Sequence, residues 1–212
     1  SALWQAKTHL EEHEIKFQPA VNEDLAATAC WGTQQAGLSE PSTHDGVVAI
    51  WYGKGPGVDR SGDPLKHGNL AGSSKYGGVL VLAGDDHVAK SSTTAHQSEQ
   101  ALVAAMIPIL YPASVQDLLN YGLIGIALSR YAGTWVGLKC VGDVVESSAT
   151  VSVDPELVSI VEPDDFKLPD DGVHIRWPDA FLDQEQRLIE VKLEAVKAFV
   201  RANRLDRVTH DV

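Results

Sequence analysis

The stretch GGVLVLAG, residues 77–84, decides the fold, because it is an unbroken run of small and branched apolar residues flanked by glycines. A short apolar run without polar alternation is typical of a strand that is buried on both faces. Strands of this kind occur mainly in parallel sheets that carry helices on both sides. The polar segment 85–99 then lies directly beyond the end of this strand.

The regions around this strand alternate between strand and helix patterns. Four more segments predict strands: IKFQPAV (15–21), GVVAIWY (46–52), IPIL (107–110) and TWVGLKCV (134–141). Helical patterns cover 2–14, 23–36, 65–76, 100–106 and 113–132, and the turn formers of GKGPGVDRSGDP (53–64) predict a loop. This alternation predicts an α/β fold, a Rossmann-like and mostly parallel sheet with helices on both faces.

Three helices carry recognisable starts. Asn22 and Ser114 are suited to cap the helices that follow them, since their side chains can accept a hydrogen bond from the first turn. Asp183 and Gln186 have the spacing of a capping box. The helix predicted after them has an apolar stripe, with spacings of four, three and four residues, formed by Ile189, Leu193, Val196 and Val200.

The domain organisation follows from a change in composition after residue 154. Residues 1–154 form the predicted α/β domain, and 155–181 read as an extended acidic connector rich in proline. Residues 182–212 are expected to hold a C-terminal helix that leads to a further domain or forms a strap across this one. The acids are unevenly spread, because nine Asp and Glu residues and one Lys lie between positions 143 and 171.

Composition excludes several classes of function. A net charge of −12 over 212 residues argues against nucleic acid and anionic membranes as partners. Cys30 and Cys140 lie in apolar surroundings, which indicates free thiols in a reducing compartment and no zinc site or iron–sulfur cluster in this chain. There is no signal peptide and no apolar run of about 20 residues, so we expect a cytoplasmic protein.

Three polar segments follow strand candidates and should therefore share one rim of the sheet. They are Asn22-Glu23, residues 53–63 and residues 85–99. Ligands of open parallel sheets bind beyond the carboxyl ends of the strands. Glu23 falls in the first turn of a helix, where the helix dipole favours an ionised carboxylate. The alternative is an ordinary capping acid on a surface helix.

The other candidates each have a functional and a structural interpretation. Asp85, Asp86 and His87 could bind a metal ion, or one Asp could cap the next segment while His87 faces water. In GKGPG (53–57), Gly53 and Gly55 could present backbone N–H groups to a ligand, although the segment lacks the Walker pattern. Lys66 and His67 could face an anionic substrate or simply be exposed.

Several long segments, taken together, resemble one family. WYGKGPGVDRSGDPLKHGNLAG, GGVLVLAGDDHVAKSSTTAHQSEQ, ALSRYAGTWVGLKCVGDVVESSATV and VNEDLAATACWGTQQ are similar to the fused, long-chain indolepyruvate ferredoxin oxidoreductases of bacteria. The similarity extends from about residue 2 to about residue 160. It implies the pyrimidine-binding domain of a thiamine-diphosphate enzyme. Such enzymes decarboxylate a 2-oxoacid, here an aryl pyruvate, pass electrons to ferredoxin and form an acyl-CoA.

The resemblance also implies roles for particular residues. Glu23 matches the glutamate that hydrogen-bonds N1′ of the aminopyrimidine, which promotes the imino tautomer that takes the proton from thiazolium C2. Asn22, Gly53 and Gly55 would adjoin the cofactor. Residues near the substrate would be Lys66, His67, Asn69, Asp85, Asp86, Ser91 and Ser92, the last four in a loop at the mouth of the site.

The resemblance further implies that much of the active site lies outside this chain. Mg²⁺ and the diphosphate belong to a separate diphosphate-binding domain of the same or another subunit, so no metal ligand is assigned here. Any iron–sulfur cluster lies elsewhere, and a first strand is expected before residue 1. We expect a fragment that is inactive alone, with an exposed apolar docking face and a tendency to form homodimers. Its further partners would be ferredoxin, the 2-oxoacid and CoA.

Two rival functions remain open at this level. The chain could be a non-catalytic regulatory or interaction module that has kept the fold. It could also be a metal-dependent hydrolase that uses Asp85, Asp86, His87 and His96. The substrate side chain, the electron acceptor and the oligomeric state do not follow from the sequence.

Overall fold

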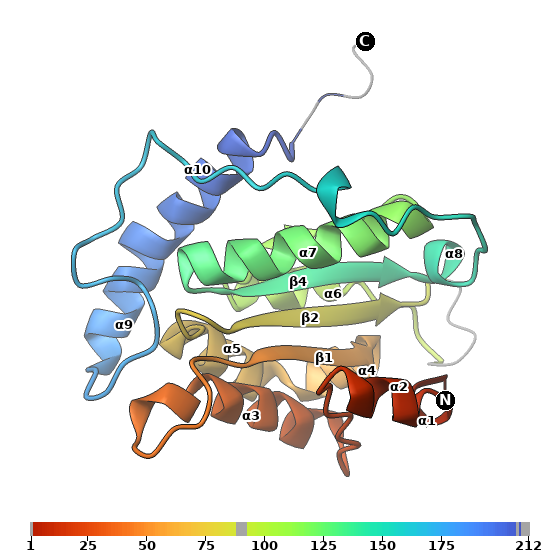
Figure 1. The fold of residues 1–212 in the computed structure, drawn as a ribbon, viewed down its shortest axis with the longest axis horizontal. Coiled ribbons are helices and arrows are strands. Elements are labelled where there is room, and N and C mark those ends of the chain that lie inside the picture. Colours follow the sequence, from red (N-terminus) through yellow and green to blue (C-terminus); the bar gives the residue numbers. More distant parts are fainter. Residues whose placement is uncertain (1, 88–92, 207, 209–212) are drawn as a thin grey trace.

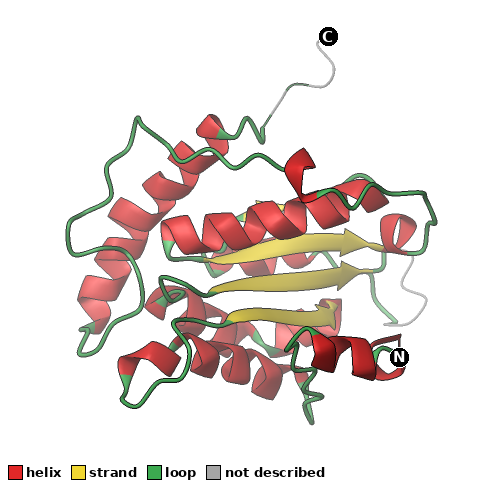
Figure 2. Ribbon diagram, viewed as in Figure 1, coloured by secondary structure: helices red, strands yellow, loops and turns green. Residues whose placement is uncertain are grey.

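The protein contains a four-stranded parallel sheet, seen in a computed structural model that describes residues 2–87, 93–206 and 208. The strands lie in the order β1-β2-β4-β3, and every neighbouring pair is parallel. Their bounds are Val48–Lys54 (β1), Gly78–Asp85 (β2), Ile109–Leu110 (β3) and Trp135–Val141 (β4). The predicted α/β, Rossmann-like fold is confirmed (Figures 1 and 2).

Helices cover both faces of the sheet. One face packs against α7 (Val115–Ala132) and α10 (Leu193–Ala202). The other packs against α3 (Glu23–Gln34), α4 (Gly55–Arg60), α5 (Gly62–Ala71) and α6 (Ser98–Ala104). Within the described residues, no helix is both long and apolar enough to cross a membrane.

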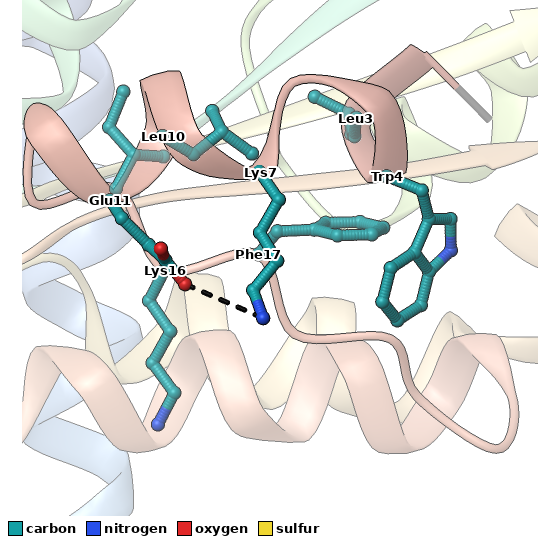
Figure 3. Close-up of a pocket in the computed structure, with 8 residues that line it drawn as sticks. Leu3, Trp4, Lys7, Leu10, Glu11, Lys16 and Phe17 are labelled. Atoms are coloured by element: carbon teal, nitrogen blue, oxygen red, sulfur yellow. Dashed lines mark ion pairs between the residues drawn. The ribbon is translucent and has the colours of Figure 1, made fainter.

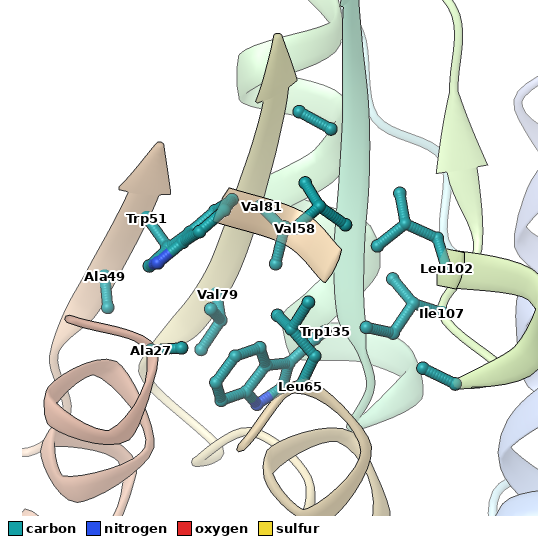
Figure 4. Close-up of a cluster of buried hydrophobic side chains, with 12 residues drawn as sticks. Ala27, Ala49, Trp51, Val58, Leu65, Val79, Val81, Leu102, Ile107 and Trp135 are labelled. Atoms are coloured by element: carbon teal, nitrogen blue, oxygen red, sulfur yellow. The ribbon is translucent and has the colours of Figure 1, made fainter. Parts of the chain in front are cut away.

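The core on the α3–α6 face is built around two tryptophans (Figure 4). Trp51 of β1 and Trp135 of β4 are almost wholly buried, together with Val79 and Val81 of β2. Each aliphatic side chain buried in this way contributes roughly 1.5–3 kcal/mol. Trp51 also donates from Nε1 to the backbone oxygen of Glu23 at 2.9 Å. The core therefore fixes the start of α3 at the end of the sheet.

Two of the predicted helix starts are confirmed. The Asn22 side chain accepts a hydrogen bond from Leu25 N at 3.0 Å, so it caps α3. Ser114 Oγ accepts from Asp117 N at 3.1 Å and caps α7. Both cysteines are free, as predicted; Cys140 is buried and Cys30 half-buried. Burial raises the pKa of each thiol to about 11, so both stay protonated at neutral pH.

Two strand predictions are wrong. Residues 15–21 form no strand. β1 forms but is not buried on both faces, because Ile50 and Tyr52 are more than half exposed. β1 is an edge strand, and α7 packs on β2 and β4 instead. The continuous apolar run of GVVAIWY gave no sign that a covering helix is absent on one side of β1.

The glycine- and proline-rich segment after β1 is helical, which corrects the predicted loop. Gly55 begins α4 and Pro56 occupies its first turn, where its missing N–H would have no intrahelical partner. Ser61 joins α4 to α5. The turn formers therefore mark two helix starts in succession, and residues 55–71 are helical apart from Ser61, whereas 72–77 are not.

The chain ends are made of short elements. The predicted N-terminal helix is broken into α1 (Ala2–Gln5) and α2 (Lys7–Glu12). Residues 155–181 are mostly irregular, and Phe166 and Leu168 pack on the α7–α10 side of the core. Three further short elements are η1 (Ala36–Leu38), α8 (Gly142–Val145) and η2 (Pro155–Leu157).

The C-terminal helix differs from its predicted form. It begins as α9 (Phe181–Arg187), passes through a π-helical turn, η3 (Leu188–Lys192), and continues as α10. No side chain caps its start at Ala180, so the predicted capping box is wrong. The π-helical turn also shifts the buried stripe: Ile189 is 45% exposed, whereas Leu188 is buried.

Candidate functional site

The candidate site lies at the carboxyl ends of the strands, on the face covered by α3 to α6. β1 ends at Lys54 and continues directly into α4. Glu23, in the first turn of α3, packs against that first turn of α4: a Cβ atom added at Gly57 would lie 2.7 Å from Glu23 Cγ and 3.3 Å from Oε1. The structure therefore places Glu23 beside segment 53–63 at the rim.

The Glu23 carboxylate is half-buried and available as a hydrogen-bond acceptor. It lies at the amino end of α3, where the unpaired N–H groups favour a negative charge. Its neighbour Asp24 is engaged with Arg60, whose Nε lies 3.2 Å from Asp24 Oδ1. In the described part of the chain, no side chain forms a hydrogen bond or an ion pair with the Glu23 carboxylate. A ligand could therefore bind it without displacing a partner.

A histidine lies against the other side of the same helical turn. Gly55 leaves no room for a side chain, because a Cβ atom there would overlap the His96 ring. His96 Nε2 lies 3.3 Å from Asp59 Oδ2, and Nδ1 lies 2.9 Å from the backbone oxygen of Thr94. Glu23 and His96 thus both border the first turn of α4.

A buried charge network closes the rim between β2 and β4. Asp85 is 1% exposed and accepts hydrogen bonds from the backbone N, at 2.8 Å, and the Oγ of Ser98. Lys139 Nζ lies 2.6 Å from Glu99 and 3.5 Å from Asp85. Asp85 therefore anchors the start of α6, which agrees with the capping interpretation of this residue.

The Lys139–Glu99 pair is held in its charged form. Burial opposes the charge on each group, but the hydrogen bond between them and their mutual attraction outweigh it. The pKa of Lys139 is raised and that of Glu99 is lowered. A pair fixed in this way is suited to holding the rim together and is poorly suited to carrying protons near neutral pH.

The residues predicted to lie near the substrate are dispersed. Lys66 and His67 are exposed on α5, and His67 stacks on Trp31 and lies 3.4 Å from Asp63. Asn69 is buried at the opposite end of the sheet, where it donates to the backbone oxygens of residues 105 and 106 and accepts from Trp135 N. Its amide is therefore committed to the core and is not brought to the rim.

The remaining predicted residues divide into three groups. Asp86 is half-buried and His87 is exposed just beyond β2. Gly53 packs on the Trp51 ring, so the core accounts for this glycine. Ser91 and Ser92 lie outside the described residues. The described residues contain no cluster of three His, Cys, Asp or Glu side chains placed to hold a metal ion.

A shallow pocket of about 180 Å³ lies elsewhere, between the N-terminal helices (Figure 3). Its aromatic side is formed by Trp4 and Phe17, whose rings meet edge to face at 5.3 Å. Lys7 and Glu11 form an ion pair of 3.6 Å at its border. None of the candidate residues lines this pocket.

Sequence reasoning missed Lys139 and Glu99, although a signal was present. Lys139 lies inside TWVGLKCV, an otherwise apolar run predicted to be a buried strand. A lysine in such a strand requires a carboxylate partner, because an unpaired buried charge is costly. The identity of the partner, 40 residues away on α6, could not be read from the chain.

Comparison with known protein families found no match, and a search of curated proteins found none either.

Proposed function

We propose that this chain is the pyrimidine-binding unit of a thiamine-diphosphate-dependent 2-oxoacid oxidoreductase of the indolepyruvate ferredoxin type. The observation that carries the proposal is the Glu23 carboxylate, half-buried at a helix start on the carboxyl rim of a parallel sheet. Ligands of such folds bind at this rim. We place the protein in the cytoplasm, where ferredoxin and CoA would be its partners.

The residues present fit one part of the cofactor. Glu23 offers an acceptor without a competing partner among the described residues, and the tight packing of Gly57 against it limits its movement. When bound, the cofactor would supply the electron sink for decarboxylation of the 2-oxoacid. Glu23 would hold the proton at N1′ of the aminopyrimidine, and Asn22 would fix the helix start that orients it.

The other parts of the site would come from a second unit. We assign the diphosphate and Mg²⁺ to a diphosphate-binding domain of the same or another subunit, as the resemblance to the indolepyruvate ferredoxin oxidoreductases implies. Val48, Ile50 and Tyr52 form an exposed apolar strip on β1 that is suited to contact such a domain, or a second copy of this chain. Alone, the chain would be inactive.

The proposal is tested by assaying the intact parent protein with indolepyruvate, CoA and a dye acceptor. We expect reduction of the dye that requires added thiamine diphosphate and Mg²⁺. An intact parent that is properly folded but inactive under these conditions would favour a non-catalytic module. Metal analysis of the purified chain tests the other rival, because stoichiometric Zn²⁺ or Mn²⁺ would favour a hydrolase.

A further inference from the structure

The C-terminal helical segment, formed by α9, η3 and α10, carries a lysine that the proposed chemistry does not use. Lys192 ends the π-helical turn η3 and is 0% exposed. Its Nζ lies 3.4 Å from the backbone oxygen of Leu70 and 3.5 Å from that of Ala71, at the end of α5. Both acceptors are neutral and both contacts are long, so they compensate an ammonium charge poorly.

The surroundings of the amine are shaped to receive it. Gly72 has a φ of +100°, and a Cβ atom there would lie 2.5 Å from Lys192 Nζ and 2.6 Å from the oxygen of Gly133. Gly133 itself ends α7 just before β4. The amine therefore occupies a slot at the amino ends of the strands, opposite the rim that holds Glu23, and it joins the C-terminal segment to that end of the sheet.

The charges that face this slot are mainly positive. On the same helical segment, Arg187 donates two hydrogen bonds of 2.8 Å to Asp179. These two bonds engage both oxygens of the Asp179 carboxylate. The adjoining loop contributes two more residues, Arg176 and His174. His174 Nε2 lies 2.6 Å from the backbone oxygen of Arg130, and Arg176 donates to the backbone oxygen of Gly172. Among the described residues, no carboxylate forms an ion pair with Lys192.

These surroundings disfavour a proton on the amine. Burial, followed by the nearby Arg187, lowers the pKa of Lys192 to about 7, although Asp179 acts in the opposite direction. Burial also lowers the pKa of His174 from its ordinary 6.5, against the hydrogen bond to Arg130. The pKa of His174 therefore lies below its ordinary value, and this imidazole is mostly neutral at pH 7.5 and above.

We propose that Lys192 is a proton-sensitive latch: as a neutral amine it fixes α9, η3 and α10 to the amino ends of β2 and β4, and as an ammonium it weakens that attachment. When the segment opens, the amine returns to water and to its ordinary pKa of 10.5. Between pH 7 and 10.5 the open state binds more protons. Opening is therefore favoured about tenfold for each pH unit lost in that range, and the dependence levels off below pH 7.

Hydrogen–deuterium exchange of the full chain at pH 7.5 and 8.5 tests the latch. After correction for the intrinsic pH dependence of exchange, peptides of α9 and α10 should open about tenfold more at the lower pH. Peptides of α3, whose local opening leaves Lys192 buried, should show no such change. Exchange of α9 and α10 that is equal at the two pH values would overturn the proposal.

Two variants separate Lys192 from its neighbours. Lys192→Met keeps the length and removes the titrating group, so it should abolish the tenfold difference. His174→Gln should retain it, because His174 is already neutral over this range. A Lys192→Met variant that keeps the difference would exclude the latch.

A titration of the unmodified protein makes the test independent of how any variant folds. The Cε resonance of Lys192, followed by NMR, should change with a midpoint near pH 7. A midpoint above pH 10 would show an ordinary, solvated ammonium and would overturn the proposal.

Discussion

Replacing Glu23 by glutamine is expected to lower kcat of the intact parent enzyme by a factor of about 10² to 10⁴, the usual contribution of a general acid–base group. Glutamine keeps the shape and the hydrogen-bond acceptor but cannot hold the negative charge that stabilises a proton at N1′. The contact with Gly57 involves Cγ, which both residues share, so the fold should be unchanged. Steady-state kinetics at saturating thiamine diphosphate provide the measurement.

Asp24→Asn is the matched control for that experiment. Asp24 lies in the same first turn of α3 and its loss removes the same amount of charge, but it pairs with Arg60 on the surface. Its substitution should leave kcat within about twofold of the unmodified enzyme. Equal losses in the two variants would mean that only the charge at the helix start matters, and an active Glu23→Gln variant would support a non-catalytic module.

The largest expected effect on stability is that of Asp85→Ala, about 3 kcal/mol of the free energy of unfolding, the lower end of the cost of breaking a buried pair. The substitution leaves Ser98 N and Oγ without their acceptor and removes one of the two carboxylates around Lys139. Lys139 still has Glu99 at 2.6 Å, which moderates the loss. Urea denaturation of the chain measures the effect.

Asp63→Ala is the control for a carboxylate on the surface. Asp63 is largely exposed, and within the described residues its one ion pair is with His67. Its replacement should therefore lower the free energy of unfolding by less than about 0.5 kcal/mol. Asp85→Asn keeps an acceptor for Ser98. Its loss in the free energy of unfolding should therefore fall between those of Asp63→Ala and Asp85→Ala. If Asp85→Ala is as stable as the unmodified chain, Asp85 is not the anchor of α6, and a direct role at the substrate becomes the better interpretation.

The sequence predicted those parts of the fold that depend on local chemistry. β2 is a continuous apolar run, and the caps of α3 and α7 use a side chain and a backbone N–H three residues apart. Such features need no knowledge of distant residues. The strand–helix alternation then fixed the α/β class, and the rule that ligands bind at carboxyl ends directed attention to the rim that contains Glu23.

Most of the failures have a common cause, since they depend on contacts between distant segments. The exposure of Ile50 and Tyr52 depends on how far α7 extends across the sheet. Pro56 is a local exception, because proline is favoured both in turns and in the first turn of a helix. Asn69, assigned to the substrate, instead links α5 to β4 through three hydrogen bonds.

The π-helical turn η3 illustrates the same limit for the C-terminal helix. A regular helix would place Ile189 in the buried stripe, but the wider turn buries Leu188 and Lys192 instead. A lysine is an improbable core residue on pattern alone. The slot beside Gly72 and Gly133 that accommodates it is formed by segments more than 50 residues away in the chain.

The most direct test of the role of Glu23 is the rate at which the C2 proton of thiamine diphosphate exchanges with deuterium when the cofactor is bound to the intact parent protein. Proton NMR should show exchange that is slowed by a factor of about 10² to 10⁴ in Glu23→Gln and is unchanged in Asp24→Asn. Exchange at the unmodified rate in a folded, cofactor-saturated Glu23→Gln variant would contradict a proton-holding role for this carboxylate.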